Sequence, residues 1–240
     1  MTNYQIINSV DHQDTRVITA ARADLGDNVH TCPAYVFEFR DLQVDFPILL
    51  QERKEGGFLP TVLMGFEQGE NLFLDDTSWA AFSKPAYMKK GPFIIGQHKA
   101  NDAEPVNVLS VDMAHPRVSH SEGEPLFQPL GGRTAFLESM ADLVERIYHG
   151  AGQTEAFADR LSELDLIESL GLDITLRDGS KNQLIGFYTI NEDRVRSMSG
   201  SELELMSNEG FLMPLFMMLA SLGNLHRLVE LKERRMEHEF

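Results

Sequence analysis

The residues best suited to bind a ligand lie between positions 79 and 93, where the only tryptophan is followed by further aromatic and basic side chains. Trp79 and Tyr87 offer ring faces, and Lys89 and Lys90 add two ammonium groups. In a chain with a formal net charge of -16, this cationic stretch can hold a carboxylate or a sugar-like ligand against the rings. Aromatic residues beside proline and lysine also anchor cores behind a solvated rim, so packing is the alternative interpretation.

Carboxylates gather just before this stretch, in the segment 65–76. Glu70 and Asp75 are the members that we include in the candidate ligand site, because paired carboxylates can act as acid and base or bind a hard cation. Acidic residues that flank a short apolar run serve equally well in turns and helix caps. Both interpretations stay open.

The most metal-like spacing belongs to Asp112, His115 and His120, which follow a predicted strand. Two imidazoles and one carboxylate can hold iron with open coordination positions. The H-x-[DE] order of the jelly-roll oxygenases is missing here. We therefore expect surface or turn roles for these residues, with no metal and no cofactor.

No motif identifies a reaction. The phosphate-binding patterns G-x-x-x-x-G-K-[ST] and G-x-G-x-x-G are absent, and so are G-x-S-x-G and H-E-x-x-H. The catalytic residues are therefore unknown, and whether the protein is an enzyme stays open.

Charge and hydropathy restrict the classes of partner. The chain has 37 acidic and 21 basic residues, and this excess repels phosphate backbones, so nucleic-acid binding is not expected. The first residues lack a basic and an apolar signal region, which predicts a cytoplasmic protein. The longest apolar run, 211–222, contains Pro214 and is too short to span a bilayer, so we expect no membrane span. Cys32 is the only cysteine, which excludes an intramolecular disulfide framework.

The first half of the chain reads as strands and turns. Apolar runs rich in β-branched and aromatic residues predict strands at 16–19, 34–39, 46–50, 61–66, 92–96 and 106–111. Glu55-Gly56-Gly57 predicts a hairpin turn, because glycine reaches positive φ at little cost. A short helix is expected at 77–88, capped by Thr77 or Ser78 and ended or kinked by Pro85.

The second half is mainly helical. Apolar spacing predicts a helix that begins after Thr134 and stops at Gly150, and a second that follows Thr154, as an αα-hairpin. A β-hairpin is expected at 172–190, with short helices capped by Asn191 and Ser201. A last helix begins near residue 211 and is apolar nearly all round its first turns. It lies centrally in the monomer or is shared with a second copy.

These elements predict an α+β protein. Its parts are a mainly antiparallel N-terminal sheet, a helical hairpin, a late β-hairpin and a C-terminal helix. We expect one domain over residues 1–240, β-rich in 1–128 and helix-rich in 129–240.

Several segments resemble the SapC family. They are Phe46-Pro47-Ile48, Gly69 to Phe73, Trp79 with Tyr87 to Phe93, Glu122 to Phe127, and Ser221 to Leu225. Where the family commonly has arginine in the basic pair before the Pro-Phe step, this chain has Lys89 and Lys90. Lysine acts as a point charge, so bidentate recognition of an anion is not expected there. The transport permease that shares the SapC name does not fit a chain without an expected membrane span.

The resemblance implies a function only in outline. The family name suggests a link to surface layers, and members are similar to proteins encoded beside outer-membrane receptors and flavin-dependent halogenase-like proteins. The first hypothesis is a non-catalytic accessory or interaction protein linked to cell-envelope or nutrient-uptake systems. The alternative is a small-ligand-binding protein or enzyme in a tailoring pathway. A third hypothesis is a homodimer through the C-terminal helix, which Leu215→Asp or Met218→Asp would disrupt. The partner, a small molecule or a protein, is unknown.

Overall fold

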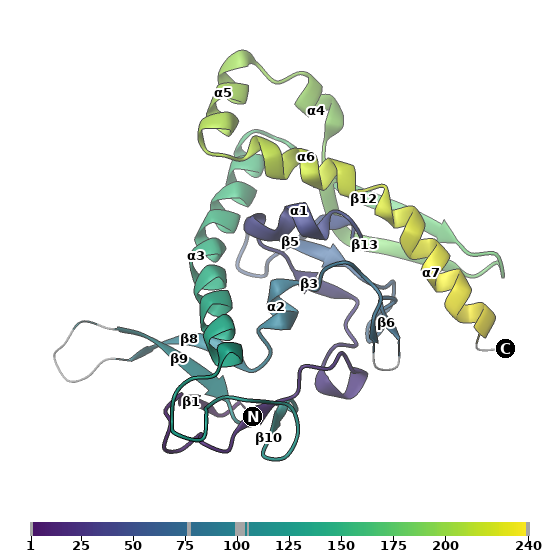
Figure 1. Cartoon of the computed structure of the whole chain (residues 1–240). Coiled ribbons are helices and arrows are strands. Elements are labelled where there is room, and N and C mark those ends of the chain that lie inside the picture. Colours follow the sequence, from purple (N-terminus) through teal and green to yellow (C-terminus); the bar gives the residue numbers. More distant parts are fainter. Residues whose placement is uncertain (1, 76–77, 99–103, 105, 239–240) are drawn as a thin grey trace. The chain divides into compact units, whose positions relative to one another are not determined.

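The computed structural model describes residues 2–75, 78–98, 104 and 106–238 and has the expected α+β class, with antiparallel sheets and helices (Figure 1). The chain divides into two compact units. Unit 1 comprises Met1–Asp27, Asp76–Ser78 and Ala86–His149, and unit 2 comprises Asn28–Asp75, Trp79–Pro85 and Gly150–Phe240. The organisation as one domain stays a prediction.

Unit 1 contains two three-stranded antiparallel sheets. The first has the order β1–β9–β8, formed by Tyr4–Ile6, Val106–Asp112 and Phe93–His98. The second has the order β10–β2–β11, formed by Val118–Ser119, Arg16–Val17 and Glu124–Pro125. The short helices η1 (Ala23–Leu25) and α2 (Ala86–Lys89) complete the unit with the first part of helix α3.

The core of unit 1 joins both sheets to the helix. Its fully buried members include Phe93, Val111, Leu126 and Leu137. Phe93 and Val111 face each other across the β8–β9 ladder, and Leu137 comes from α3. Burial of these side chains is the main favourable term that holds the short strands together.

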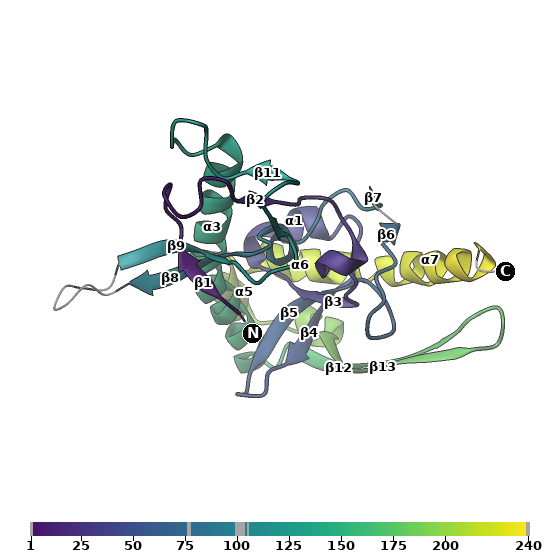
Figure 2. The same cartoon turned by 90° about the horizontal axis from the view of Figure 1, so that it is seen from below.

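Unit 2 is built on a five-stranded antiparallel sheet of order β12–β13–β4–β5–β3. The strands are Ile167–Thr175, Lys181–Ile190, Ile48–Glu52, Phe58–Leu63 and Thr31–Pro33. The predicted hairpin between β4 and β5 is confirmed (Figure 2), with positive φ at Gly56 and Gly57 and a hydrogen bond from Arg53 N to Gly57 O of 2.9 Å. The predicted β-hairpin at 172–190 is confirmed as β12–β13, and it begins earlier, at Ile167.

The helices of unit 2 include η2 (Val36–Glu38), α1 (Phe39–Leu42), α4 (Glu192–Arg196), α5 (Gly200–Asn208), α6 (Leu212–Ser221) and α7 (Asn224–His238). Of these, α6 packs against β4 and β13 of the sheet and also contacts α1 and α5. Two two-residue strands, β6 (Leu74–Asp75) and β7 (Ser78–Trp79), lie in the loop region that follows β5 in the chain. Phe157 of α3 contacts Phe39 and Phe211 edge to face, with ring centroids 5.9 and 5.5 Å away. This aromatic contact connects three segments that are distant in the sequence.

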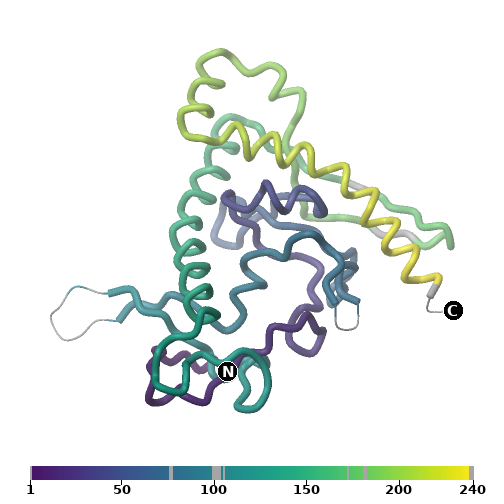
Figure 3. The backbone as a smooth tube through the Cα atoms, in the orientation of Figure 1, coloured from purple at the N-terminus to yellow at the C-terminus, as the bar shows by residue number. Residues whose placement is uncertain are grey.

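The predicted αα-hairpin is wrong, because one helix, α3, runs from Ala135 to Glu163 (Figure 3). Thr134 caps its start as expected, accepting a hydrogen bond from Leu137 N at 3.2 Å. Gly150 does not stop the helix. Glycine is needed there because a Cβ would lie 2.6 Å from the ring of Phe37. Thr154 lies inside the helix, where its hydroxyl donates to Gly150 O and accepts from Val36 N. Both residues are explained by contacts with the segment 36–37 and not by a turn.

The predicted strand at 34–39 is also wrong. Its residues form η2 and the start of α1. The Glu38 carboxylate accepts a hydrogen bond from Tyr35 N, and the Thr154 hydroxyl accepts one from Val36 N. Side chains therefore satisfy donors that a strand would have paired with a neighbour.

The helix expected at 77–88 is wrong for residues 78–85: Ser78 and Trp79 form β7, and the helix α2 begins only at Ala86, after Pro85. Thr77 lies outside the described residues. Ala80 N donates to Phe73 O at 2.8 Å, so tertiary pairing replaces helical hydrogen bonds. Ser199 and not Ser201 caps α5, whereas Asn191 caps α4 as predicted.

The last helix is interrupted between α6 and α7, at Leu222 and Gly223. Among the described residues, the stretch Leu212–Glu237 is long and apolar enough to cross a membrane by length and composition, a test that core helices of soluble proteins also pass. The absence of a membrane span therefore stays a prediction.

Candidate functional site

Trp79 is a partly buried member of an aromatic cluster in unit 2. Its ring centroid lies 6.2 Å from that of Phe46 and 6.4 Å from that of Phe73. The indole nitrogen donates to Ser83 O at 2.7 Å, and Lys84 Nζ lies 5.5 Å from the ring centroid. Trp79 therefore packs against Phe46 and Phe73, in agreement with the packing interpretation. The ammonium group of Lys84 also lies over its ring.

The loop that follows Trp79 is fastened by Asp45, which sequence reasoning missed. The Asp45 carboxylate is 3% exposed and accepts a hydrogen bond from Phe82 N at 2.5 Å. It also forms an ion pair with Arg227 of α7, whose guanidinium carbon lies 5.8 Å from the ring centroid of Phe73. The side chain of Phe82 is 78% exposed at the tip of this loop. An exposed aromatic ring on a fixed backbone is suited to contact a partner or ligand.

Glu70 is held in place by contacts within unit 2. Its carboxylate accepts a hydrogen bond from Phe66 N at 2.7 Å and forms an ion pair with Lys232 of α7 at 2.6 Å. Burial lowers the pKa of the Lys232 ammonium group, but the hydrogen bonds and charges of Glu70 and Glu67 raise it. The net result is a pKa above the ordinary value for lysine. Glu70 therefore works as a loop-closing residue, in agreement with the turn interpretation.

The remaining candidates of the ligand site are divided between the units. Asp75 is an exposed residue of β6 in unit 2. Tyr87, Lys89 and Lys90 belong to α2 or its end in unit 1, where Lys90 Nζ lies 4.7 Å from the ring centroid of Tyr87. The structure brings Trp79 together with Lys84. Lys89 and Lys90 belong to the other unit.

The three metal candidates do not form a ligand set, and over the described ranges no group of three His, Cys, Asp or Glu residues is arranged to hold a metal ion. Asp112 accepts hydrogen bonds from Asn3 N and Ala114 N, and the Asn3 bond is the main reason why the pKa of this carboxyl lies below its ordinary value. His115 Nδ1 accepts from Arg117 N at 3.1 Å, and burial lowers the pKa of its imidazole. His120 is exposed. The turn interpretation of Asp112 and His115 agrees with these contacts.

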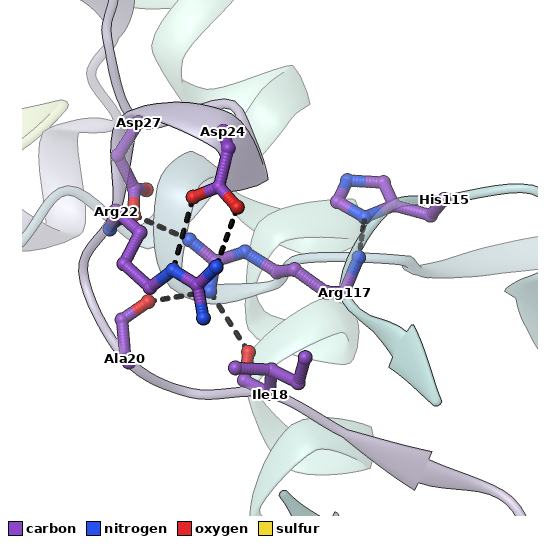
Figure 4. A network of polar contacts seen from close by, with 7 residues as sticks. All are labelled: Ile18, Ala20, Arg22, Asp24, Asp27, His115 and Arg117. Atoms are coloured by element: carbon purple, nitrogen blue, oxygen red, sulfur yellow. Dashed lines mark hydrogen bonds and ion pairs between the residues drawn. The ribbon is translucent and has the colours of Figure 1, made fainter. Parts of the chain in front are cut away.

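Next to His115 lies a buried ion pair that sequence reasoning also missed (Figure 4). Arg117 donates to Asp27 at 2.5 Å and to the carbonyl oxygens of Ile18 and Ala20 at 2.8 and 2.9 Å. Asp27 also accepts from Arg22 N at 2.9 Å. A paired charge with satisfied donors holds the segment 18–27 in place and does not mark a reaction centre.

In unit 2, the segments that carry the SapC resemblance converge. Ser221 Oγ accepts a hydrogen bond from Ile48 N, and Asn224 Nδ2 donates to Phe46 O. Phe46 lies 4.5 Å from Phe73 between ring centroids, and Arg235 donates to Asn71 O and Leu74 O. Three of the resembling segments, with Trp79, are therefore joined by polar and aromatic contacts that hold α6 and α7 against the loops.

Comparison with known proteins gives one match. The family model described as SapC matches residues 7–228, which is nearly the whole chain. No curated protein and no solved structure matches it. The chain therefore belongs to the SapC family.

Proposed function

We propose that this protein is a non-catalytic accessory protein that acts by binding another protein chain. The observation that carries the proposal is the surface of α6. Met213 and Phe216, three residues apart on the helix, are 57% and 51% exposed. Leu215 and Met218, on the opposite face, are buried in unit 2. An apolar stripe on a helix that is already anchored on its other side is typical of an interaction surface.

The engagement of two candidate carboxylates, Glu70 and Asp112, supports the same proposal. Glu70 is bound to Phe66 N and Lys232, and Asp112 to two backbone N–H groups. Asp45, which was not a candidate, is bound to Phe82 N and Arg227, whereas the candidate Asp75 is exposed. A general base needs an accessible lone pair near a substrate proton. The bound carboxylates instead stabilise the fold.

The experiment is a comparison of four variants by light scattering and thermal unfolding. Met213→Asp and Phe216→Asp place a charge on the exposed stripe and should leave the melting temperature nearly unchanged. Leu215→Asp and Met218→Asp, the variants that the sequence suggested, bury a charge and should unfold the protein, so they do not test the surface. If the wild-type protein is a dimer, the two surface variants should be monomers.

If the wild-type protein is a monomer, the stripe is free for a different protein. The protein would then be cross-linked in its native cells, and the same partner should be lost with Phe216→Asp and retained with Arg234→Gln, an exposed position of α7. Unchanged oligomeric state and unchanged partner recovery in both surface variants would contradict the proposal.

We propose that this activity takes place in the cytoplasm. The link to cell-envelope or nutrient-uptake systems is what the family resemblance implies. The acidic excess makes a nucleic-acid partner unfavourable. No membrane span is part of the proposal.

A second candidate function is small-ligand binding, or an enzymatic step in a tailoring pathway, at the loop of Trp79. It is favoured by the exposed ring of Phe82 and by Lys84 over the indole. A melting-temperature screen with small carboxylates and sugars, together with metal analysis, tests it, because a ligand of the native state raises the melting temperature. Turnover of a defined small substrate would replace the first proposal with this one.

A further inference from the structure

A pocket in unit 1 lies beside the small sheet β10–β2–β11, is open to solvent and has a volume of about 820 Å³. Its polar lining residues are Gln13, Asp14, Arg16 and His120. Its apolar lining comes from Pro125, Phe127 and Pro129. All these residues belong to unit 1, so the pocket is formed within one compact unit.

The backbone fixes the position of Arg16 in this pocket. Arg16 pairs with Ser119 of β10 and with Pro125 of β11. Pro125 itself lines the pocket, and the lining residue His120 follows Ser119 in the chain. Gly123 has a φ of 93°, and a Cβ on it would lie 2.3 Å from Val17 O. The loop between β10 and β11 can therefore approach β2 this closely only with glycine at this position. That approach allows Arg16 Nη1 to donate to Gly123 O at 2.9 Å.

The charges in the pocket are not neutralised by ion pairs. Across the described part of the chain, Arg16, His120 and Asp14 form no salt bridge, although the protein carries a large excess of carboxylates. One N–H group of the Arg16 guanidinium donates to the neutral carbonyl oxygen of Gly123. This bond does not neutralise the positive charge, and the other N–H groups can still donate to a ligand. A guanidinium in this state is suited to bind a carboxylate with two parallel hydrogen bonds.

We propose that this pocket binds a small monocarboxylate with a flat apolar body. Arg16 holds the carboxylate, His120 adds a ring nitrogen at the rim, and Phe127 with the two prolines covers the apolar body. Asp14 and the net charge of -16 oppose ligands that carry several negative charges, such as polyphosphates. This site is independent of the apolar stripe on α6, which lies in unit 2.

The test is a titration of the full chain with sodium benzoate, followed by amide chemical shifts in NMR spectra. We expect saturable shifts in residues 13–16 and 119–129. Benzamide has the same ring without the charge and should bind about tenfold or more weakly, because a hydrogen bond to a charged group is lost. Added sodium chloride should weaken benzoate binding and leave benzamide binding nearly unchanged.

Variants separate the role of the guanidinium from general charge. Arg16→Gln should lower the affinity for benzoate about tenfold or more. The affinity of Arg16→Lys should lie between those of the wild type and Arg16→Gln, because lysine keeps the charge without the planar guanidinium. Arg146→Gln removes an exposed arginine of α3 in the same unit and should bind benzoate like the wild type. The variant Phe216→Asp should also bind it normally.

Three results would overturn the proposal: no saturable shift with benzoate, equal affinity for benzoate and benzamide, or unchanged affinity in a folded Arg16→Gln variant. If Arg16→Gln does not fold, the comparison of the two ligands on the wild-type protein and on Arg16→Lys decides.

Discussion

At the residue scale, several polar side chains of unit 2 bind backbone groups of distant segments. Asp45 accepts from Phe82 N, Ser221 accepts from Ile48 N, and Arg235 donates to Asn71 O and Leu74 O. Each bond satisfies a backbone group in a loop or at the end of a strand, and buried backbone groups require such a partner. The identity of these residues is therefore explained by folding before any ligand is considered.

Asp45→Ala is expected to lower the free energy of unfolding by about 1–3 kcal/mol, because it removes a buried acceptor and leaves Phe82 N and Arg227 without it. Thermal or urea unfolding measures this loss. Asp41→Ala is the matched control, since Asp41 is an exposed residue of α1 nearby in the chain, and it should change stability by a few tenths of a kcal/mol at most. Equal effects of the two substitutions would show that Asp45 does not fasten the loop.

At the element scale, the ends and interiors of helices depend on contacts that spacing alone does not reveal. Gly150 is in the interior of α3 because the ring of Phe37 lies against it, and Phe37 is stacked on Tyr35 at 5.7 Å between ring centroids. Gly152, two residues further along the same helix, has no heavy atom within 4 Å of the position of a Cβ. The two glycines therefore have different reasons for being in a helix.

Gly152→Ala should stabilise the protein by about 0.5–1 kcal/mol, since alanine loses less backbone entropy in a helix. Gly150→Ala should destabilise it, because the new methyl group would displace the ring of Phe37. Chemical denaturation of both variants measures the difference. Adding Phe37→Ala to Gly150→Ala should cost less than Phe37→Ala costs in the wild type. An increase in stability for Gly150→Ala would mean that the ring moves away freely.

The start of α5 offers a pH-dependent test. Glu202 accepts hydrogen bonds from Ser199 N and Arg194, and these lower the pKa of its carboxyl to about 2. Since the folded pKa lies below the ordinary value of about 4.3, its stabilisation is present above that pH and is lost as pH falls toward 2. An NMR titration should give this value and a higher one in Arg194→Gln. A carboxyl of Glu202 that titrates near 4 in the wild type would contradict the cap.

Ser199→Ala should cost about 1 kcal/mol of stability, because the serine hydroxyl accepts from Glu202 N in the capping box. Ser201→Ala is the control and should cost much less, since Ser201 lies in the first turn and does not cap it. Thermal unfolding of the two variants at neutral pH distinguishes them. If Ser201→Ala lost more stability than Ser199→Ala, Ser201 would be the cap of α5, as the sequence suggested.

At the scale of the whole molecule, charge is the dominant property. Acidic residues exceed basic ones by 37 against 21, so repulsion among carboxylates acts on the folded chain in addition to its ion pairs. Most of these ion pairs have at least one exposed partner, and such pairs contribute little. Screening by salt should therefore weaken the repulsion among carboxylates more than it weakens the attraction within ion pairs, and so stabilise the folded chain.

The melting temperature is expected to rise by a few degrees when sodium chloride increases from about 0.01 to 0.15 M, because the Debye length falls from about 30 to 8 Å. Scanning calorimetry at neutral pH measures it. Sodium sulfate also strengthens hydrophobic burial and is not a suitable replacement. A fall in melting temperature with sodium chloride would mean that the ion pairs outweigh the repulsion.

Local sequence patterns are sufficient to predict the α+β class, the β4–β5 and β12–β13 hairpins, the start of α3 after Thr134 and the family. These features depend on local periodicity, on glycine in turns and on motifs that are read along the chain. The role of Trp79 in ligand binding stays a prediction, and its contacts with Phe46, Phe73 and Lys84 cannot be read from the sequence.

Long-range contacts, which the sequence does not reveal, explain the continuity of α3, the turn at 36–38, the role of Glu70 and the pocket around Arg16. In each case the deciding partner is far away in the sequence: Thr154 for Val36, Lys232 for Glu70, and Gly123 for Arg16. Local propensities differ by less than 1 kcal/mol per residue, so a few long-range hydrogen bonds and ring contacts overrule them.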